Sequence, residues 1–342
     1  MATRSTPATA LAETLPIVDL RYAPGAVAQA VHAAGRRHGF FYVVGHGIEP
    51  ALGAELERLS HRFFALPEAV KAGFAMAHGG RAWRGWFPLG GELTSGRPDW
   101  KEGLYLGTEL PPEHPRVRAG VPLHGANLLP GDDVLPGFAA VVRCWIAEVT
   151  ALGQRVLRAI AAALELPPAW FEEHWTADPL VLFRIFLYPS RPVPDGVQAL
   201  WGVGEHTDYG LLTLLRQDDV GGLAVKGPGG WIDAPPVPDS FVCNIGDMLE
   251  RATGGYFKST PHRVRLNASA RDRLSFPLFL DPDFEARIEP IRVPQAGVHA
   301  DLMNDARERW DGASVHAFDG RYGDYVLAKV GKVFPDLGKA VL

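Results

Sequence analysis

The spacing of the hydrophobic residues changes near residue 178. Before this point, apolar side chains recur every three or four positions in three stretches, a period typical of helices with one buried face. Pro167 and Pro168 end the longest of these stretches, because proline cannot continue a helix. Between the first two stretches, an aromatic and β-branched run at 39–44 predicts a short strand. The predicted helices cover 27–37, 51–64 and 136–166.

After residue 178 the apolar runs are short, and clusters of Gly, Pro and Asp separate them. Such runs predict strands, and many short strands at close intervals favour a β-sandwich or a double-sheet jelly roll. An amphipathic segment at about 298–310 predicts a final helix. The expected strands are 181–188, 211–216, 222–225, 241–245, 264–266, 273–280 and 288–291.

No linker or internal repeat divides the chain. We therefore expect one compact unit of mixed α and β class, with a jelly-roll core flanked by N-terminal helices and a C-terminal helix. Within it, residues 1–177 are expected to form a mainly helical region with short strands. Residues 178–296 are expected to form the β core, and residues 297–342 a helix and tail.

Composition restricts the class of protein. Of the 342 residues, 47% are hydrophobic and 21% are charged, which suffices for a large core and excludes general disorder. The net charge of −5 argues against nucleic-acid binding. No apolar run is long enough to span a membrane. Only two cysteines are present, Cys144 and Cys243, so we expect a cytoplasmic protein without a disulfide framework. The oligomeric state is not indicated.

The segment Gly204–Gly210 contains a candidate metal site. If His206 and Asp208 belong to a strand, their side chains point to the same side and can converge on one ion. His262 opens a later β segment and is the candidate third ligand. Two histidines and one carboxylate form the ligand set of non-haem Fe(II) oxygenases. The alternative is a hydrogen-bonded His–Asp pair at a strand end.

A second His-x-Asp sequence, His299–Asp301, shows that this spacing alone is weak evidence for a metal site. It falls in the amphipathic segment, and on a helix residues two apart do not face each other. We therefore interpret this pair as part of a solvated helix start and not as a chelate.

Arg273 and Ser275 form a candidate anion site. Both lie on one face of an expected strand, and a guanidinium with a hydroxyl is a good receptor for a carboxylate. Tyr188, at the end of another strand, can add its hydroxyl. The alternatives are an arginine that extends to the sheet edge and a tyrosine with a solvated tip.

With these residues, the chain resembles the isopenicillin N synthase-like group of Fe(II)- and 2-oxoglutarate-dependent dioxygenases. The resemblance runs nearly from end to end, and the order of the motifs makes it specific. The matching motifs are Leu15–Leu20, Gly39–Gly47, Phe63–Pro67, His206–Asp208, Asn244–Asp247, Lys258–Val264, Arg273–Ser275 and Tyr322–Phe334.

The resemblance implies a double-stranded β-helix in which His206, Asp208 and His262 bind Fe(II). It further implies that Arg273 and Ser275, with help from Tyr188, hold the distal carboxylate of 2-oxoglutarate. The implied reaction uses O₂, releases succinate and CO₂, and hydroxylates, desaturates or cyclises a small molecule. Two residues depart from the pattern: Phe186 stands where many members have an asparagine that orients the cosubstrate, and Gly45 replaces another asparagine.

The stretch from Arg81 to Tyr105 is rich in Trp, Arg and Gly. Aromatic walls and guanidinium donors suit a planar or carboxylated small molecule. The alternative is packing between the N-terminal helices and the barrel. The candidate substrate contacts are Arg84, Trp86, Phe87, Tyr105 and, ahead of the metal pair, Trp201.

Three other functions stay open. The first is an Fe(II) oxidase of the same fold that does not use 2-oxoglutarate, because the Arg273–Ser275 pair can instead hold a substrate carboxylate. The second is a non-catalytic small-molecule binding protein. The third is a hydrolytic zinc site, which fits this ligand set less well than iron does.

Overall fold

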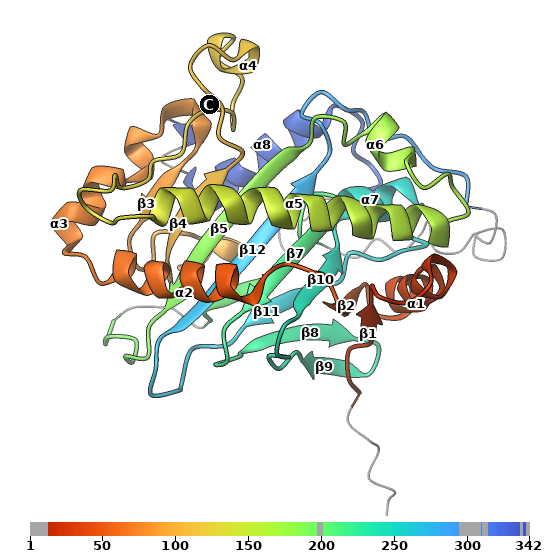
Figure 1. The fold of residues 1–342 in the computed structure, drawn as a ribbon, viewed down its shortest axis with the longest axis horizontal. Coiled ribbons are helices and arrows are strands. Elements are labelled where there is room, and N and C mark those ends of the chain that lie inside the picture. Colours follow the sequence, from red (N-terminus) through yellow and green to blue (C-terminus); the bar gives the residue numbers. More distant parts are fainter. Residues whose placement is uncertain (1–12, 197–200, 294–308, 310–313, 336–337, 340–342) are drawn as a thin grey trace, which may run out of the picture.

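The computed structural model describes residues 13–196, 201–293, 309, 314–335 and 338–339. Three long helices lie in the first half: α1 (Pro24–Arg37), α2 (Pro50–Phe64) and α5 (Phe138–Ala163). In Figure 1, α5 crosses the face of the larger sheet, with α2 beside it. The expected apolar stripe of α5 is buried from Phe138 to Ile160, so the prediction of this helix is confirmed.

The larger sheet has eight strands and combines the front of the chain with its second half. All neighbouring strands in it are antiparallel except β1 and β2, which are parallel. In spatial order the strands are β1 (Ile17–Asp19), β2 (Phe40–Val44), β10 (Phe241–Ile245), β7 (Leu212–Gln217), β12 (Arg273–Asp281), β5 (Leu180–Tyr188), β4 (Glu102–Gly107) and β3 (Gly85–Phe87).

The smaller sheet contains four antiparallel strands and supplies two of the candidate metal ligands. With the larger sheet it makes the two-sheet arrangement expected of a jelly roll. In spatial order its strands are β6 (Val203–His206), β11 (His262–Val264), β8 (Leu223–Gly227) and β9 (Gly230–Asp233).

The register of β4, β5 and β12 determines which side chains point inward. Tyr105 pairs with Arg184, and Arg273 pairs with Tyr188. Directly opposed residues in antiparallel strands point to the same face. These four side chains therefore share the inner face of the larger sheet.

Shorter helices complete the fold. Among them, α8 lies after all the strands in the described part of the chain, and Phe334, the residue that follows it, packs against β3 and β4. The short α-helices are α3 (Glu68–Lys71), α4 (Pro115–Arg118), α6 (Trp170–His174), α7 (Asp247–Ala252) and α8 (Tyr322–Val333), and the 3-10 helices are Ala72–Phe74, Met76–His78, Gly80–Ala82 and Thr94–Gly96.

Two expected elements differ from the structure. The strand expected at 264–266 lies earlier, as β11 at His262–Val264. The strand expected at 288–291 is absent, and that part of the chain contributes a single bridge between Arg287 and Arg321. Pro290 has no N–H to donate, which disfavours a continuous ladder there. The helix expected at 298–310, with its His299–Asp301 pair, falls outside the described residues apart from Arg309.

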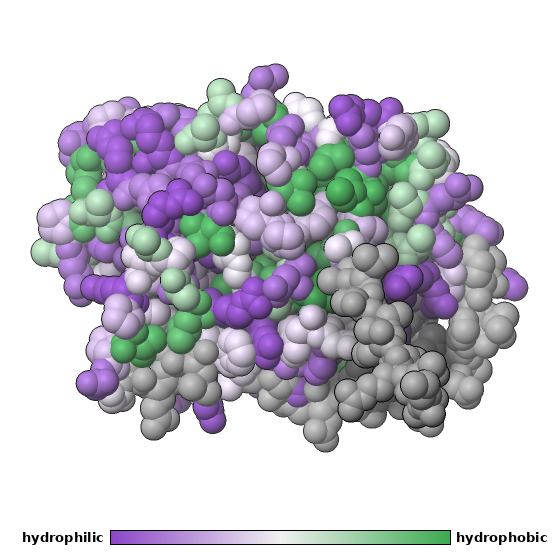
Figure 2. All heavy atoms as spheres, turned by 90° about the horizontal axis from the view of Figure 1, so that it is seen from below, coloured by the Kyte–Doolittle hydropathy of each residue, from purple (hydrophilic) through white to green (hydrophobic). Residues whose placement is uncertain are grey.

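The surface mixes polar and apolar side chains. On the face shown in Figure 2, hydrophobic residues form small separate groups among hydrophilic ones. No helix in the described part of the chain is long and apolar enough to cross a membrane.

Candidate active site

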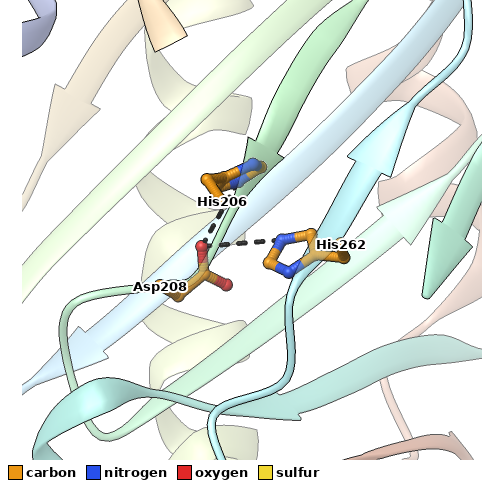
Figure 3. Close-up of side chains that lie close together, drawn as sticks. All are labelled: His206, Asp208 and His262. Atoms are coloured by element: carbon orange, nitrogen blue, oxygen red, sulfur yellow. Dashed lines mark ion pairs between the residues drawn. The ribbon is translucent and has the colours of Figure 1, made fainter. Parts of the chain in front are cut away.

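His206, Asp208 and His262 meet at one point in the structure. His206 is the last residue of β6, and His262 is the first residue of β11. The two strands are neighbours, and the two histidines are paired in register. Asp208 follows two residues after His206, beyond the end of the strand. The three side chains point toward one another in Figure 3.

The geometry suits a single metal ion. The Nε2 atoms of His206 and His262 each lie 3.7 Å from Oδ1 of Asp208. One donor atom from each residue falls within 4.8 Å of the other two. An ion placed among them would be bound on one side by the three donor atoms, and its other coordination positions would stay open for further ligands.

Backbone carbonyls orient both imidazole rings. Nδ1 of His206 lies 2.8 Å from the carbonyl oxygen of Gly204, and Nδ1 of His262 lies 3.2 Å from that of Thr260. A carbonyl oxygen can only accept, so the proton is assigned to Nδ1 in each ring. Nε2 then presents its lone pair to the centre of the site, as metal binding requires.

The carboxylate of Asp208 is held by its other oxygen. Oδ2 accepts hydrogen bonds from Thr213 Oγ1 at 2.6 Å and Asn244 Nδ2 at 2.7 Å. Burial alone would raise the pKa of Asp208, but the two neighbouring histidines and these hydrogen bonds lower it. For His262, burial disfavours the charged imidazolium and lowers the pKa to about 4. At neutral pH the site therefore offers a carboxylate and a neutral imidazole, both ready to bind a cation.

These three residues line a cavity of about 130 Å³ between the sheets, close to the roughly 150 Å³ of a cavity that binds benzene. Its walls are mostly aromatic and aliphatic, and α8 contributes Val326, Val330 and Val333. Such a chamber admits a small molecule and excludes a folded polymer.

Arg273 lines the same cavity and has unused donors. Its side chain is buried, with 1% of the residue exposed. Nη2 donates to Oε1 of Gln217 at 3.2 Å, whereas Nε and Nη1 have no hydrogen-bond partner among the described residues. A buried guanidinium with two unsatisfied donors requires an acceptor. A carboxylate fits this requirement, because it can accept two hydrogen bonds from one guanidinium.

Tyr188 and Ser275 surround this guanidinium. The Arg273 guanidinium lies 4.6 Å from the centre of the Tyr188 ring. The Ser275 hydroxyl lies 3.4 Å from the Tyr188 hydroxyl. All three residues line the cavity, so the structure brings together the anion site expected from the sequence and the three candidate metal ligands.

Of the five expected substrate contacts, Tyr105 lines the cavity and the other four do not. Arg84 is buried elsewhere and donates to the carbonyl oxygens of Leu106 and Leu123. The indole of Trp86 donates to Glu102. These placements correspond to the packing alternative.

The two remaining residues also pack against the protein. Phe87 contacts Tyr105, Phe186 and Phe334 edge to face. Trp201 lies against the guanidinium of Arg263, which is 4.3 Å from its ring. Phe87 thus packs behind Tyr105 and Phe186, which do line the cavity.

Several polar residues of the site were not anticipated from the sequence. Lys101, Glu92 and Arg184 line the cavity, and Thr213 and Asn244 support Asp208. An available signal was the alternation of inward positions along β4 and the residue before it, because Tyr105 and Lys101 are an even number of residues apart.

The comparisons with known proteins agree with this geometry. A family model described as "non-haem dioxygenase in morphine synthesis N-terminal" matches residues 15–132, and one described as "2OG-Fe(II) oxygenase superfamily" matches residues 177–282. The chain belongs to the 2OG-Fe(II) oxygenase superfamily. It is an Fe(II)- and 2-oxoglutarate-dependent dioxygenase, and the family, cofactors and jelly-roll fold expected from the sequence are confirmed.

Named relatives cover nearly the whole oxygenase. A Dictyostelium discoideum protein named a probable iron/ascorbate oxidoreductase is 47% identical, over 96% of this chain and 97% of its own. A 1-aminocyclopropane-1-carboxylate oxidase from Dictyostelium mucoroides is 37% identical, over 95% and 96%. A full-length Neurospora crassa protein, solved in complex with α-ketoglutarate (2-oxoglutarate) and thymine, has a TM-score of 0.74 and 28% identity, covering 93% of this chain and 96% of that one.

Asp281 gives the metal-free oxygenase a distinctive pH dependence. Burial raises the pKa of Asp281 from 3.8 to about 7. The folded protein keeps this carboxyl group protonated up to about pH 7, whereas the unfolded chain loses the proton near pH 4. The stabilising effect of the protonated group is therefore full below about pH 4 and is lost as the pH rises through about 7. Asp281→Asn should keep the hydrogen bond from Tyr322 and raise the free energy of unfolding at pH 8 by up to about 4 kcal/mol.

Urea unfolding of the chelator-treated protein at pH 5 and pH 8 measures this effect. Asp219→Asn is the control, because Asp219 is exposed and its pKa is lowered by Arg271. A gain in stability for Asp281→Asn that is equal at both pH values would contradict the assignment.

Proposed function

We propose that His206, Asp208 and His262 bind the Fe(II) of this oxygenase, and that Arg273, Ser275 and Tyr188 bind the distal carboxylate of 2-oxoglutarate. The observation that carries this proposal is the buried Arg273 guanidinium, whose Nε and Nη1 atoms lack partners among the described residues, beside the cavity that the three metal-binding candidates line. When bound, iron, 2-oxoglutarate and O₂ supply the oxidising equivalents that functionalise a substrate C–H bond.

The protein's own residues provide orientation and a dry chamber. The carbonyl oxygens of Gly204 and Thr260 hold the imidazoles, and Thr213 and Asn244 hold the carboxylate of Asp208. These contacts fix the donor atoms before the ion arrives, which reduces the cost of ordering them. The apolar walls exclude water from the reacting centre.

A direct experiment tests the dependence on 2-oxoglutarate. Succinate formation and O₂ consumption are measured with Fe(II), with and without 2-oxoglutarate, across a panel of small molecules. We expect succinate to form and substrate to stimulate it. O₂ consumption that needs substrate but not 2-oxoglutarate would instead indicate an oxidase, and failure to bind Fe(II) or Mn(II) would indicate a binding protein.

We propose that the substrate is a small molecule. The names of the relatives do not specify it further. One relative is named for 1-aminocyclopropane-1-carboxylate, and one structure contains thymine. These compounds differ in charge and shape, so neither name transfers to this chain. The volume and apolar walls of the cavity support a compact substrate.

We also propose that the oxygenase works in the cytoplasm. Cys144 is exposed and Cys243 is buried, and both are free thiols. Burial raises the pKa of the Cys243 thiol, which keeps it protonated and unreactive. Unpaired thiols together with a ferrous cofactor suit a reducing compartment.

Gln217 offers a test of the carboxylate site. Its amide oxygen accepts from Arg273 at 3.2 Å, and its Nε2 donates to the carbonyl of Ala234. Gln217→Glu would place an internal carboxylate beside the guanidinium, in competition with 2-oxoglutarate. The Kd of 2-oxoglutarate, measured by calorimetry on Mn(II)-loaded protein, should rise about 10-fold. Gln154→Glu, which alters a contact with Thr176, should leave it unchanged, and equal effects would contradict the proposal.

A further inference from the structure

A second set of charged side chains lines the cavity in addition to the proposed metal ligands and Arg273. Glu92, Lys101 and Arg184 form part of its wall. These residues are 7%, 1% and 5% exposed. Together with Tyr105 and Asp99 we call them the Lys101 cluster.

Ion pairs, a hydrogen bond and a cation–π contact connect the members of the cluster. Nζ of Lys101 lies 2.9 Å from Oε2 of Glu92 and also pairs with Asp99. The Tyr105 hydroxyl donates to the other oxygen of Glu92. The Arg184 guanidinium lies 3.5 Å from the centre of the Tyr105 ring. The cluster is therefore a connected network on one part of the cavity wall.

The cluster is also tied to the strand that carries His206. Oδ1 of Asp99 accepts from the backbone N–H of Gly204 at 3.1 Å, and Oδ2 accepts from Thr94 at 2.6 Å. Asp99 is not part of the cavity wall. It supports Lys101 from behind, which leaves Lys101 and Glu92 as the charged pair at the wall.

Stability alone does not explain this network. Removing two charges from water is costly, and well-packed apolar residues of similar volume commonly serve as well or better. The proposed iron and 2-oxoglutarate sites use none of these residues. Natural enzymes retain buried ionic groups where they recognise a ligand, so the cluster points to the remaining ligand of the cavity, the substrate.

The charges of the cluster balance. Burial would lower the pKa of Lys101, but Asp99 and Glu92 raise it, so the ammonium stays charged. Lys101 and Arg184 supply two positive charges, and Glu92 and Asp99 supply up to two negative ones. A ligand with a net charge would leave a buried charge uncompensated. A ligand that carries one charge of each sign and is neutral overall would not.

We propose that the substrate is a small amino-acid-type zwitterion, which the Lys101 cluster binds by its charged end. Its ammonium donates to Oε2 of Glu92, which lies 2.9 Å from Nζ of Lys101 and, as a carboxylate oxygen, can accept from a second donor. Its carboxylate accepts from Lys101 and Arg184. The apolar remainder packs against cavity residues such as Leu182 and Val330. This inference rests on the proposed function and specifies its substrate class.

The test uses matched ligands on the full chain loaded with Mn(II) and 2-oxoglutarate, so that no turnover occurs. The panel contains the apolar proteinogenic amino acids in both enantiomers. Each is accompanied by the acid that lacks its amino group and the amine that lacks its carboxylate. Binding is read from calorimetry, and succinate formation is measured separately with Fe(II). At least one amino acid should bind at least 10-fold more tightly than both of its truncated analogues.

Variants then identify the residues. Glu92→Gln should weaken binding of that amino acid at least 10-fold, whereas the acid without an amino group should bind at least as well as to the wild type, because the variant removes a negative charge beside Lys101. Glu102→Gln is the matched control: Glu102 pairs with Lys71 on the outer face of β4, so its loss should not change ligand binding. Circular dichroism and 2-oxoglutarate affinity show whether each variant retains its fold.

The outcomes separate the two proposals. If the protein binds Mn(II) and 2-oxoglutarate but no amino acid in the panel, the substrate class is wrong and the proposed function stands. The same conclusion follows if Glu92→Gln and Glu102→Gln act alike, or if the truncated analogues bind as well as the amino acid. If neither Mn(II) nor 2-oxoglutarate binds, the proposed function itself fails.

Discussion

Asp208→Ala should abolish turnover and remove high-affinity metal binding with it. Oδ1 of Asp208 is the atom that both histidine Nε2 atoms approach. Loss of residues that merely support a ligand costs about 10- to 100-fold in metal affinity or activity, so loss of the ligand itself should exceed 100-fold. Mn(II) binding, followed by calorimetry or electron paramagnetic resonance, measures the metal site without depending on turnover.

Two variants control this experiment. Asn244→Ala removes one hydrogen bond to Oδ2 of Asp208 and should weaken metal binding within the 10- to 100-fold range. Asp219→Asn changes an exposed carboxylate paired with Arg271 and should have no effect. An Asp208→Ala protein that folds, binds Mn(II) normally and turns over substrate would refute the metal assignment.

Arg273→Ala should raise the Kd of 2-oxoglutarate by roughly 30-fold to 4,000-fold, while metal binding persists. The expected loss is about 2–5 kcal/mol, the cost of truncating one partner of a buried charge pair. Arg273→Lys should fall between wild type and alanine, because lysine keeps the charge but loses the planar fork. Titration of 2-oxoglutarate into Mn(II)-loaded protein gives the Kd directly.

Arg271→Ala is the natural control for Arg273. It lies two residues earlier, but its guanidinium is exposed and pairs with Asp219 on the surface. Exposed ion pairs contribute little, so both stability and 2-oxoglutarate affinity should stay close to wild type. Similar losses in the two variants would exclude Arg273 as the carboxylate anchor.

The convergence of His206, Asp208 and His262 was predictable from the sequence, but the strand geometry given as its reason holds only in part. The spacing of His206 and Asp208 suggested two residues on one face of a strand, whereas β6 ends at His206 and Asp208 lies beyond it. The carboxylate still reaches the centre because Thr213 and Asn244 hold it. The pairing of His262 with His206 depends on strand register, which no local pattern reveals.

The polar wall of the cavity was harder to predict. Trp86 pairs with Leu104 in the register of β3 and β4, and its indole donates to Glu102 on the outer side. Tyr105 pairs with Arg184 on the inner side. A shift of one residue moves a side chain to the opposite face, so composition alone could not distinguish inner from outer aromatic residues. Glu92 and Lys101 meet because the segment between them, which contains the 3-10 helix Thr94–Gly96, folds back, and no local pattern in the sequence indicates its path.

The cavity draws its walls from distant parts of the sequence: Phe40 comes from β2, and Val326, Val330 and Val333 come from α8. A ribosome therefore completes the chamber only after it has added α8, when His206, Asp208 and His262 have long been synthesised. A fragment limited to 178–296 would carry these three residues and Arg273 but would leave them open to bulk water. For directed evolution, α8 is a place to reshape the chamber without altering the three residues proposed to bind the metal.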